Sequence, residues 1–295
     1  MWPNRKSLVF CRIEMDEIFS WCLTTPYTLD IHRNLKEREL FGRNIKFQSP
    51  QLLHRPKLVD WLKTVSEKLK LSQVTLHLGI FLLDKFMDKH NILNSRLVPA
   101  AVVCLILAAK FEEEDVQVPK FTDIPSVLNI TSTPSELIHL EAFVLQSLSW
   151  NISWPTVAHF AEFYSVFAVV KGDRDPTHKS SKNLTDAVRR TMREFIDLSL
   201  SVLSSEVGML KYLASQVAAA CLLAARLDHG IRPAWPDVMV ALTGYSANNL
   251  RSCLALLTDI DINYPRKRKS EVNNESGYES GSPECKVSYK LQRRE

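Results

Sequence analysis

The stretch that decides the fold is AVVCLILAAK, at residues 101–110. It is apolar on nearly every side of a helix, so it predicts a helix that is buried all round. A similar stretch, VAAACLLAAR, occupies residues 217–226. Two such helices predict two helical units, each built around its own buried helix.

Other pairs of segments repeat at almost the same spacing as these two helices. Leu83-Asp84 aligns with Ile196-Asp197, and Leu137 aligns with Leu250. A near-constant offset over separate helices is typical of a duplicated unit. Helices rich in alanine and leucine also resemble each other through composition alone, and that alternative stays open at this point.

Helix start signals and apolar spacing predict two sets of five helices. Ser49-Pro50 and Thr133-Pro134 each place a capping hydroxyl before a proline, and Glu136 completes a capping box after Thr133. The expected helices span roughly residues 50–69, 73–89, 96–111, 121–129, 134–148, 156–169, 184–204, 208–227, 235–243 and 247–259. The expected fold class is all-α.

Composition excludes several classes of protein. Among 295 residues only 8 are glycine, and no GxGxxG, GxxxxGK[ST], GxSxG or HExxH motif occurs. The eight histidines show no metal-ligand spacing with cysteine, and we expect His139 and His159 to be ordinary packed or surface residues. The sequence therefore predicts a protein that is not an enzyme and that has no metal and no cofactor.

Apolar runs and cysteines indicate in which cellular compartment the protein is expected. The longest apolar run, residues 97–109, is interrupted by a proline and is shorter than the about 20 residues of a membrane span. The N-terminus has no apolar stretch of signal-peptide length. Six cysteines occur without a CxxC motif, and Cys104, Cys221 and Cys253 fit buried positions on helices. We expect no membrane partner and a reducing compartment.

The chain divides into four parts by pattern and charge. We expect an N-terminal extension (1–49), a first helical unit (50–152), a second unit (153–262) and a disordered basic tail (263–295). Residues 171–183 are polar and are expected to form a long loop. The tail carries eight Lys or Arg and five Glu, so the rest of the chain is nearly neutral and nucleic acid is not an expected partner.

Three segments of the first unit resemble the cyclin box. Residues 54–62 (HRPKLVDWL) resemble its first-helix motif, and residues 107–113 (LAAKFEE) resemble the end of its third helix. Residues 137–145 resemble the fifth-helix segment with its glutamate. The spacing between these segments is also similar to that of cyclins.

The second unit and the segment before the first unit extend this resemblance. Residues 154–160 (WPTVAHF) and 215–220 (SQVAAA) resemble the second cyclin fold, so that the similarity covers about residues 50–262. Residues 31–40, with Ser49-Pro50-Gln51-Leu52, look most like the cyclin J subfamily. The resemblance implies tandem five-helix cyclin folds.

The cyclin resemblance implies a kinase-binding surface centred on Lys110 and Glu141. Glu141 falls inside the apolar stripe of its helix, where a carboxylate needs a partner. Ordinary readings exist, since a lysine at a helix C-terminus complements the dipole and a glutamate can lie at the edge of a stripe. In cyclins this pair contacts the kinase helix that carries the catalytic glutamate. The expected apolar surround is Phe111, Leu145, Trp150 and Ile152.

The resemblance favours a regulatory subunit of a cyclin-dependent kinase catalytic subunit, acting in cell-cycle control. Two alternatives remain: a cyclin-fold adaptor or transcription-related scaffold without kinase activation, and an inactive helical scaffold.

Further expectations concern substrates, location and turnover. At the first-helix groove that binds Arg-x-Leu peptides in cyclins, Leu58 and Trp61 are kept, whereas His54 and Lys57 replace apolar residues and predict weakened docking. The expected location is the nucleus, alone or together with the cytoplasm. The candidate nuclear-import signal is a basic run in the tail: Arg266, Lys267, Arg268 and Lys269. Ser276 and Ser280 resemble a phosphorylated degron that a ubiquitin ligase reads.

Overall fold

The structure is a computed structural model, and it describes residues 27–42, 45–46, 48–174, 181–205 and 212–263. The described part is almost entirely helical and contains no strand beyond one isolated bridge between Arg174 and Arg232. The expected all-α class is confirmed.

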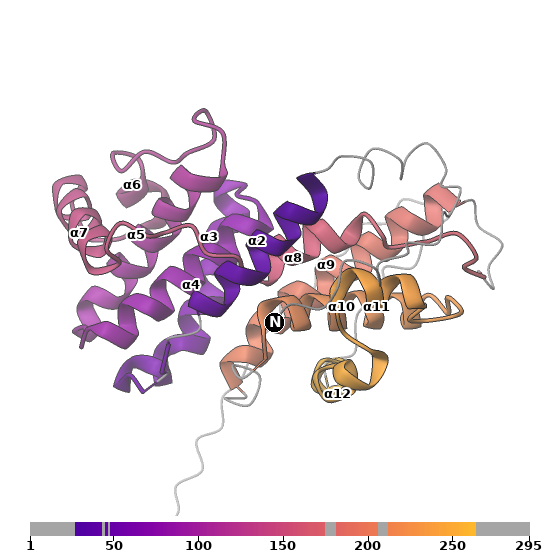
Figure 1. The fold of residues 1–295 in the computed structure, drawn as a ribbon. Coiled ribbons are helices and arrows are strands. Elements are labelled where there is room, and N and C mark those ends of the chain that lie inside the picture. Colours follow the sequence, from indigo (N-terminus) through magenta and orange to yellow (C-terminus); the bar gives the residue numbers. More distant parts are fainter. Residues whose placement is uncertain (1–26, 43–44, 47, 175–180, 206–211, 264–295) are drawn as a thin grey trace, which may run out of the picture.

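Two helical units lie side by side along the chain (Figure 1). The first unit consists of η1 (Pro50–His54), α3 (Arg55–Leu69), α4 (Gln73–Lys89), α5 (Asn94–Glu112), α6 (Ile124–Leu128) and α7 (Pro134–Ser147). The second unit consists of α8 (Val157–Ser165), α9 (Ser181–Ser205), α10 (Ala214–Asp228), α11 (Asp237–Thr243) and α12 (Ala247–Asn263). Apart from the short 3₁₀ turn that replaces the start of the first predicted helix, each unit has the five predicted helices in the predicted order.

One apolar helix forms the centre of each unit. Every residue of α5 from Pro99 to Ala109 is buried, and α10 is buried over almost its whole length. By length and composition α5 could cross a membrane, but 67% of its most apolar window is buried inside the protein. Gly79 of α4 allows the close crossing of α4 over α5, because a Cβ atom there would lie 3.0 Å from the Cα of Leu105.

The expected caps at Ser49 and Thr133 are present, and Ser72 caps a further helix. The Ser49 and Ser72 side chains accept hydrogen bonds from backbone amides of the first turns that follow them. Thr133 and Glu136 form a complete capping box at the start of α7. These bonds satisfy amides that have no partner within their own helix and so fix where the helices begin.

Helix α2 (Tyr27–Gly42) is the main departure from the prediction, which gave no helix to residues 1–49. It lies across the junction of the two units (Figure 1): it contacts α10 of the second unit, and a Cβ atom on Gly42 would lie 3.5 Å from Phe81 of α4 in the first unit. The Glu39 carboxylate accepts hydrogen bonds from the Ser215 backbone N–H (2.6 Å) and hydroxyl (2.8 Å). Since the N-cap residue of α10, Leu213, supplies no side-chain cap, Glu39 caps α10 from another helix.

The polar segment expected to be one long loop, residues 171–183, is only partly so. Helix α9 begins at Ser181, and Asp173 is buried in an ion pair with Arg226. The segment therefore has a fixed anchor that its composition does not indicate.

Candidate functional site

The Lys110 and Glu141 side chains form the expected pair. Lys110 lies in the last turn of α5, Glu141 lies in α7, and the distance from Nζ to Oε1 is 2.6 Å. The Lys110 side chain is 43% exposed and that of Glu141 14%. Nζ also lies 4.9 Å from the centroid of the Phe121 ring. The pair is therefore preformed and open to a partner on one side.

The fold does not need this pair for its stability. Partly exposed ion pairs contribute about 0–1 kcal/mol, because water screens them and two long side chains must be ordered. The aligned position in the second unit is Arg226, whose guanidinium makes five hydrogen bonds in a completely buried site. The same position thus has a structural role in the second unit and faces solvent in the first.

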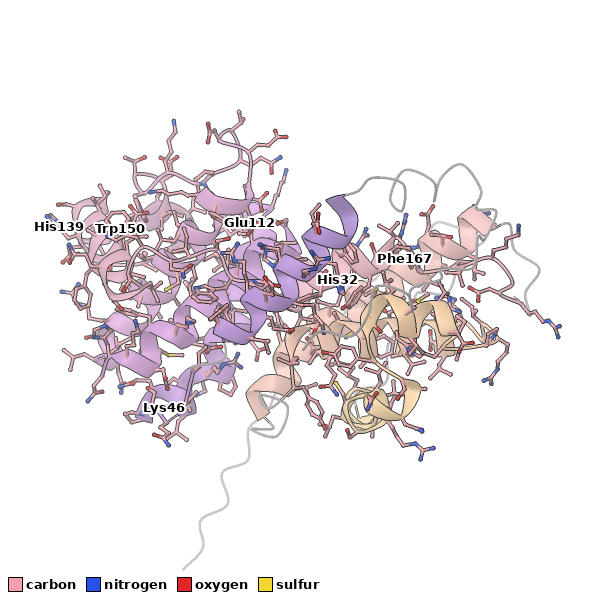
Figure 2. The ribbon with its side chains drawn as sticks, viewed as in Figure 1. His32, Lys46, Glu112, His139, Trp150 and Phe167 are labelled. Atoms are coloured by element: carbon pink, nitrogen blue, oxygen red, sulfur yellow. The ribbon has the colours of Figure 1, made fainter. Side chains whose placement is uncertain are left out.

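Two of the expected surround residues, Phe111 and Trp150, have exposed side chains. Phe111 follows Lys110 directly and is 46% exposed, and Trp150 is 67% exposed. Trp150 lies beyond α7, where Ser149 and Trp150 both adopt left-handed backbone conformations that turn the chain (Figure 2). Large exposed aromatic side chains on a folded surface are typical of protein interfaces.

Leu145 and Ile152 differ from the other expected surround residues. Both are only half-buried and pack against the core of the first unit. Each side chain presents only part of its area to solvent.

Two residues beside the Lys110–Glu141 pair were not among those expected from the sequence. Ile138 of α7 is 52% exposed, and Phe121 lies next to Lys110. Together with Val118 and Pro119 they line a shallow groove beside the lysine. Ile138 could have been found, because it precedes Glu141 by three residues and so shares its helix face. Phe121 could not, because it belongs to the connection before α6.

The four first-helix residues expected to form a docking groove differ in how far their side chains are exposed. Leu58 is 6% exposed and belongs to the core, and Trp61 is half-buried against it. Lys57 is exposed, and His54 ends η1. The surface of α3 therefore offers less apolar area than the sequence motif alone indicates.

The remaining candidate residues either have ordinary structural roles or lie outside the residues that the structure describes. Within the described ranges no three His, Cys, Asp or Glu side chains are grouped to hold a metal. His159 links Glu112 (3.0 Å) to Thr156, and His139 is exposed on α7. The tail candidates lie outside the described residues: Arg266, Lys267, Arg268, Lys269, Ser276 and Ser280.

The three described cysteines are buried and free, as expected. Burial raises the pKa of each thiol: Cys104, Cys221 and Cys253. A thiol that is buried and held neutral is inert as a nucleophile.

Comparison with known proteins agrees with this geometry. The family model "Cyclin, N-terminal domain" matches residues 30–153, and "Cyclin, C-terminal domain" matches residues 155–288. The chain belongs to the cyclin family. The first match includes all of α2 except its first three residues, so nearly the whole helix falls within the N-terminal family domain.

The expected similarity to cyclin J is also confirmed. The chain is 34% identical to Cyclin-J of Xenopus laevis over 254 residues, which is 83% of this chain and 66% of that protein. It is 33% identical to human Cyclin-J, covering 84% of this chain and 65% of that protein. The match spans slightly less than two thirds of each of these relatives.

Solved structures show the same fold. A viral cyclin from herpesvirus saimiri superposes with a TM-score of 0.61 at 19% identity, over 79% of this chain and 99% of the viral chain. A chain of the CAK complex of Chaetomium thermophilum bound to ATP-gamma-S gives a TM-score of 0.54 at 15% identity, over 78% of this chain and 71% of that chain.

Proposed function

We propose that this chain binds and activates a cyclin-dependent protein kinase as its regulatory subunit, in cell-cycle control. Cyclins are regulatory subunits without catalytic activity, and this chain supplies a surface rather than a reaction centre. The observation that carries the proposal is the Lys110–Glu141 pair, which is preformed at 2.6 Å and partly exposed, with the apolar side chains of Phe121 and Ile138 beside the lysine.

The pair offers complementary groups to a kinase helix. The Lys110 ammonium has donors for backbone carbonyls, and the Glu141 carboxylate accepts from backbone or side-chain N–H groups. The apolar side chains of Phe111 and Ile138 are exposed, next to Lys110 in the sequence and in the groove beside it, and would exclude water around these bonds. Such bonds strengthen when a partner covers them, because the surrounding dielectric falls.

Activation follows from which kinase state the surface binds better. A protein kinase needs the glutamate of its αC helix paired with the β3 lysine before the phosphates of ATP are held correctly. A cyclin that docks on αC stabilises the arrangement in which this pair is formed. It shifts the kinase toward activity only to the extent that it binds this state more tightly than the inactive state.

The test is co-purification followed by a kinase assay. The tagged full chain is expressed in eukaryotic cells, and recovered complexes are assayed for phosphorylation of a generic substrate. We expect a kinase to be recovered and active with the parent chain, and lost with Lys110→Ala/Glu141→Ala.

A matched control exists on the same two helices. Arg96 of α5 and Glu136 of α7 also form an exposed pair, at 3.9 Å, and neither residue lines the groove beside Lys110. The variant Arg96→Ala/Glu136→Gln removes this pair but keeps an oxygen for the α7 capping box. It should recover kinase normally. A bound kinase with no activity would indicate an adaptor instead of an activator.

We propose further that the tail determines location and turnover. Four consecutive cations at residues 266–269 suit an acidic import receptor, so replacing all four by alanine should shift the chain toward the cytoplasm. Phosphates on Ser276 and Ser280 would suit a basic pocket of a ubiquitin ligase. Ser276→Ala/Ser280→Ala should lengthen the half-life measured after translation is blocked, whereas equal decay would remove the degron.

A further inference from the structure

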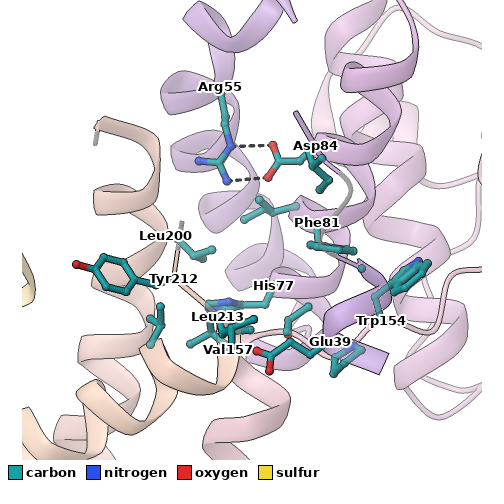
Figure 3. Close-up of a pocket in the computed structure, with 17 residues that line it drawn as sticks. Glu39, Arg55, His77, Phe81, Asp84, Trp154, Val157, Leu200, Tyr212 and Leu213 are labelled. Atoms are coloured by element: carbon teal, nitrogen blue, oxygen red, sulfur yellow. Dashed lines mark hydrogen bonds and ion pairs between the residues drawn. The ribbon is translucent and has the colours of Figure 1, made fainter. Parts of the chain in front are cut away.

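Two ion pairs of the first unit differ in what holds their side chains in place. Arg55 donates from Nε and one terminal nitrogen to both oxygens of Asp84, at 2.7 and 2.8 Å, and both side chains are buried (Figure 3). Close packing around them keeps that pair in one arrangement. Lys110, by contrast, donates to one oxygen of Glu141, and its side chain is 43% exposed. Because a lysine has a long and flexible stem, an exposed one populates many rotamers unless a further contact restricts it.

The ring of Phe121 provides this further contact. Lys110 Nζ lies 4.9 Å from the centroid of the ring. A cation within about 6 Å of an aromatic face is attracted to the quadrupole of the ring, and the attraction is stronger when water is removed from the contact. The ring and the Glu141 carboxylate together restrict where the ammonium can lie.

Phe121 is itself fixed by the first unit. Its side chain is half-buried and packs against the core of that unit. In the turn that follows it, the Lys120 carbonyl accepts hydrogen bonds from the backbone N–H groups of Asp123 (3.0 Å) and Ile124 (3.3 Å), and the Ile124 side chain is buried. The core and the turn therefore set the position of the ring, which can act as a rigid support for the lysine.

An aromatic ring suits this role better than other side chains would. The lysine ammonium carries three N–H donors, and Glu141 accepts from one of them. A second carboxylate would occupy another donor, whereas the ring attracts the cation and leaves the other donors available to a partner. An aliphatic side chain in the same place would pack against the stem but would not attract the charge.

We propose that Phe121 is a positioning residue of the kinase-binding surface, whose ring holds the Lys110 ammonium beside Glu141 with its other donors available to backbone carbonyls of the partner helix. This inference rests on the proposed function, because a kinase is the partner that the ammonium serves. Phe121 acts through Lys110, so its replacement should matter only while the lysine is present. When the partner covers the site, water leaves the contact and the attraction becomes stronger.

The test is a double-mutant cycle that measures the dissociation constant for the co-purified kinase. Phe121→Leu keeps an apolar side chain but removes the ring. It should weaken binding about fivefold to tenfold, the factor that corresponds to the strengthening of a cation–π contact on desolvation. Phe121→Tyr keeps the ring and should bind like the parent. In the Lys110→Ala background, Phe121→Leu should have no further effect.

A second measurement needs no kinase. In the full chain with isotope-labelled lysine, the ring current of Phe121 should shift the NMR signal of the Lys110 Hε protons upfield, and Lys110→Ala assigns this signal by its loss. The shift should vanish in Phe121→Leu and remain in Phe121→Tyr. Phe143→Leu is the matched control and should change neither measurement, because Phe143 is 48% exposed on α7, packs against Phe86 and His90, and does not line the groove beside Lys110.

The outcomes separate this inference from the proposed function. If the parent recovers no kinase, or if Lys110→Ala binds normally, the proposed function fails and this inference fails with it. If binding depends on Lys110 but Phe121→Leu binds like the parent, only this inference is overturned. The same holds if Phe121→Leu weakens binding equally in the Lys110→Ala background, or if the Lys110 signal of the parent is not shifted.

Discussion

Replacing Arg226 should destabilise the fold far more than replacing Lys110, although the two residues occupy aligned positions in the two units. Arg226 is completely buried, and its guanidinium binds both oxygens of Asp173, at 2.7 and 2.8 Å. It also donates to the backbone carbonyls of Ala168, Pro233 and Ala234. Lys110 has one ion-pair partner and is 43% exposed.

The structure sets the size of each effect. Arg226→Ala leaves a buried carboxylate without its counter-charge, which costs about 3–5 kcal/mol, and it leaves three carbonyls without a donor. Lys110→Ala removes a partly exposed pair worth about 0–1 kcal/mol. Arg226→Ala should therefore lower the free energy of unfolding by about 4 kcal/mol or more, and Lys110→Ala by less than about 1 kcal/mol.

Urea denaturation followed by circular dichroism measures both changes on the purified chain. The midpoint should fall strongly for Arg226→Ala and hardly at all for Lys110→Ala. Arg226→Lys keeps the charge but loses the bidentate contact with Asp173, so its urea midpoint should lie between those of the other two variants. Similar, small losses for Arg226→Ala and Lys110→Ala would refute the reasoning that one position is structural and the other is free for binding.

Three further changes have defined outcomes. Glu39→Gln weakens the cap that α2 provides for Ser215, so it should cost about 1–3 kcal/mol and speed amide exchange in α2 measured by mass spectrometry. Burial lowers the pKa of His77 from 6.5 to about 3 in the folded chain, so the unfolded chain binds the proton first and stability is lost as the pH falls below 6.5. Lowering the pH from 7 to 5 should therefore reduce the free energy of unfolding by about 2 kcal/mol more in the parent than in His77→Gln, measured by urea denaturation. Arg-x-Leu peptides should bind weakly or not at all, because Leu58 is buried and Lys57 repels the peptide arginine; micromolar affinity by titration calorimetry would contradict this.

Much of the fold is visible in the sequence because its signals are local. The stretches at 101–110 and 217–226 are apolar all round, and such helices have to be buried. Caps such as Ser72 and the Thr133–Glu136 box fix helix starts within a few residues. The Lys110–Glu141 pair followed from the family resemblance, and the structure brings the two side chains together at 2.6 Å.

What the sequence did not predict depends on distant partners. The side of α2 that faces the second unit carries polar residues: His32 stacks on Phe163, and Glu39 caps α10 at Ser215. Because these polar contacts lie more than a hundred residues away along the chain, the sequence around α2 gives no clear apolar stripe to reveal the helix. Likewise, only tertiary structure shows that Arg226 is buried beside Asp173.

The central claim is that Lys110 and Glu141 form the polar centre of a kinase interface. The most direct measurement is the dissociation constant between the purified chain and the kinase that co-purifies with it, for the parent, Lys110→Ala and Glu141→Ala. Removing one partner from a desolvated charge centre costs about 2–5 kcal/mol, so each variant should bind at least tenfold more weakly. Arg96→Ala/Glu136→Gln should bind like the parent. Unchanged affinity for both single variants, with their helical content intact, would contradict the account.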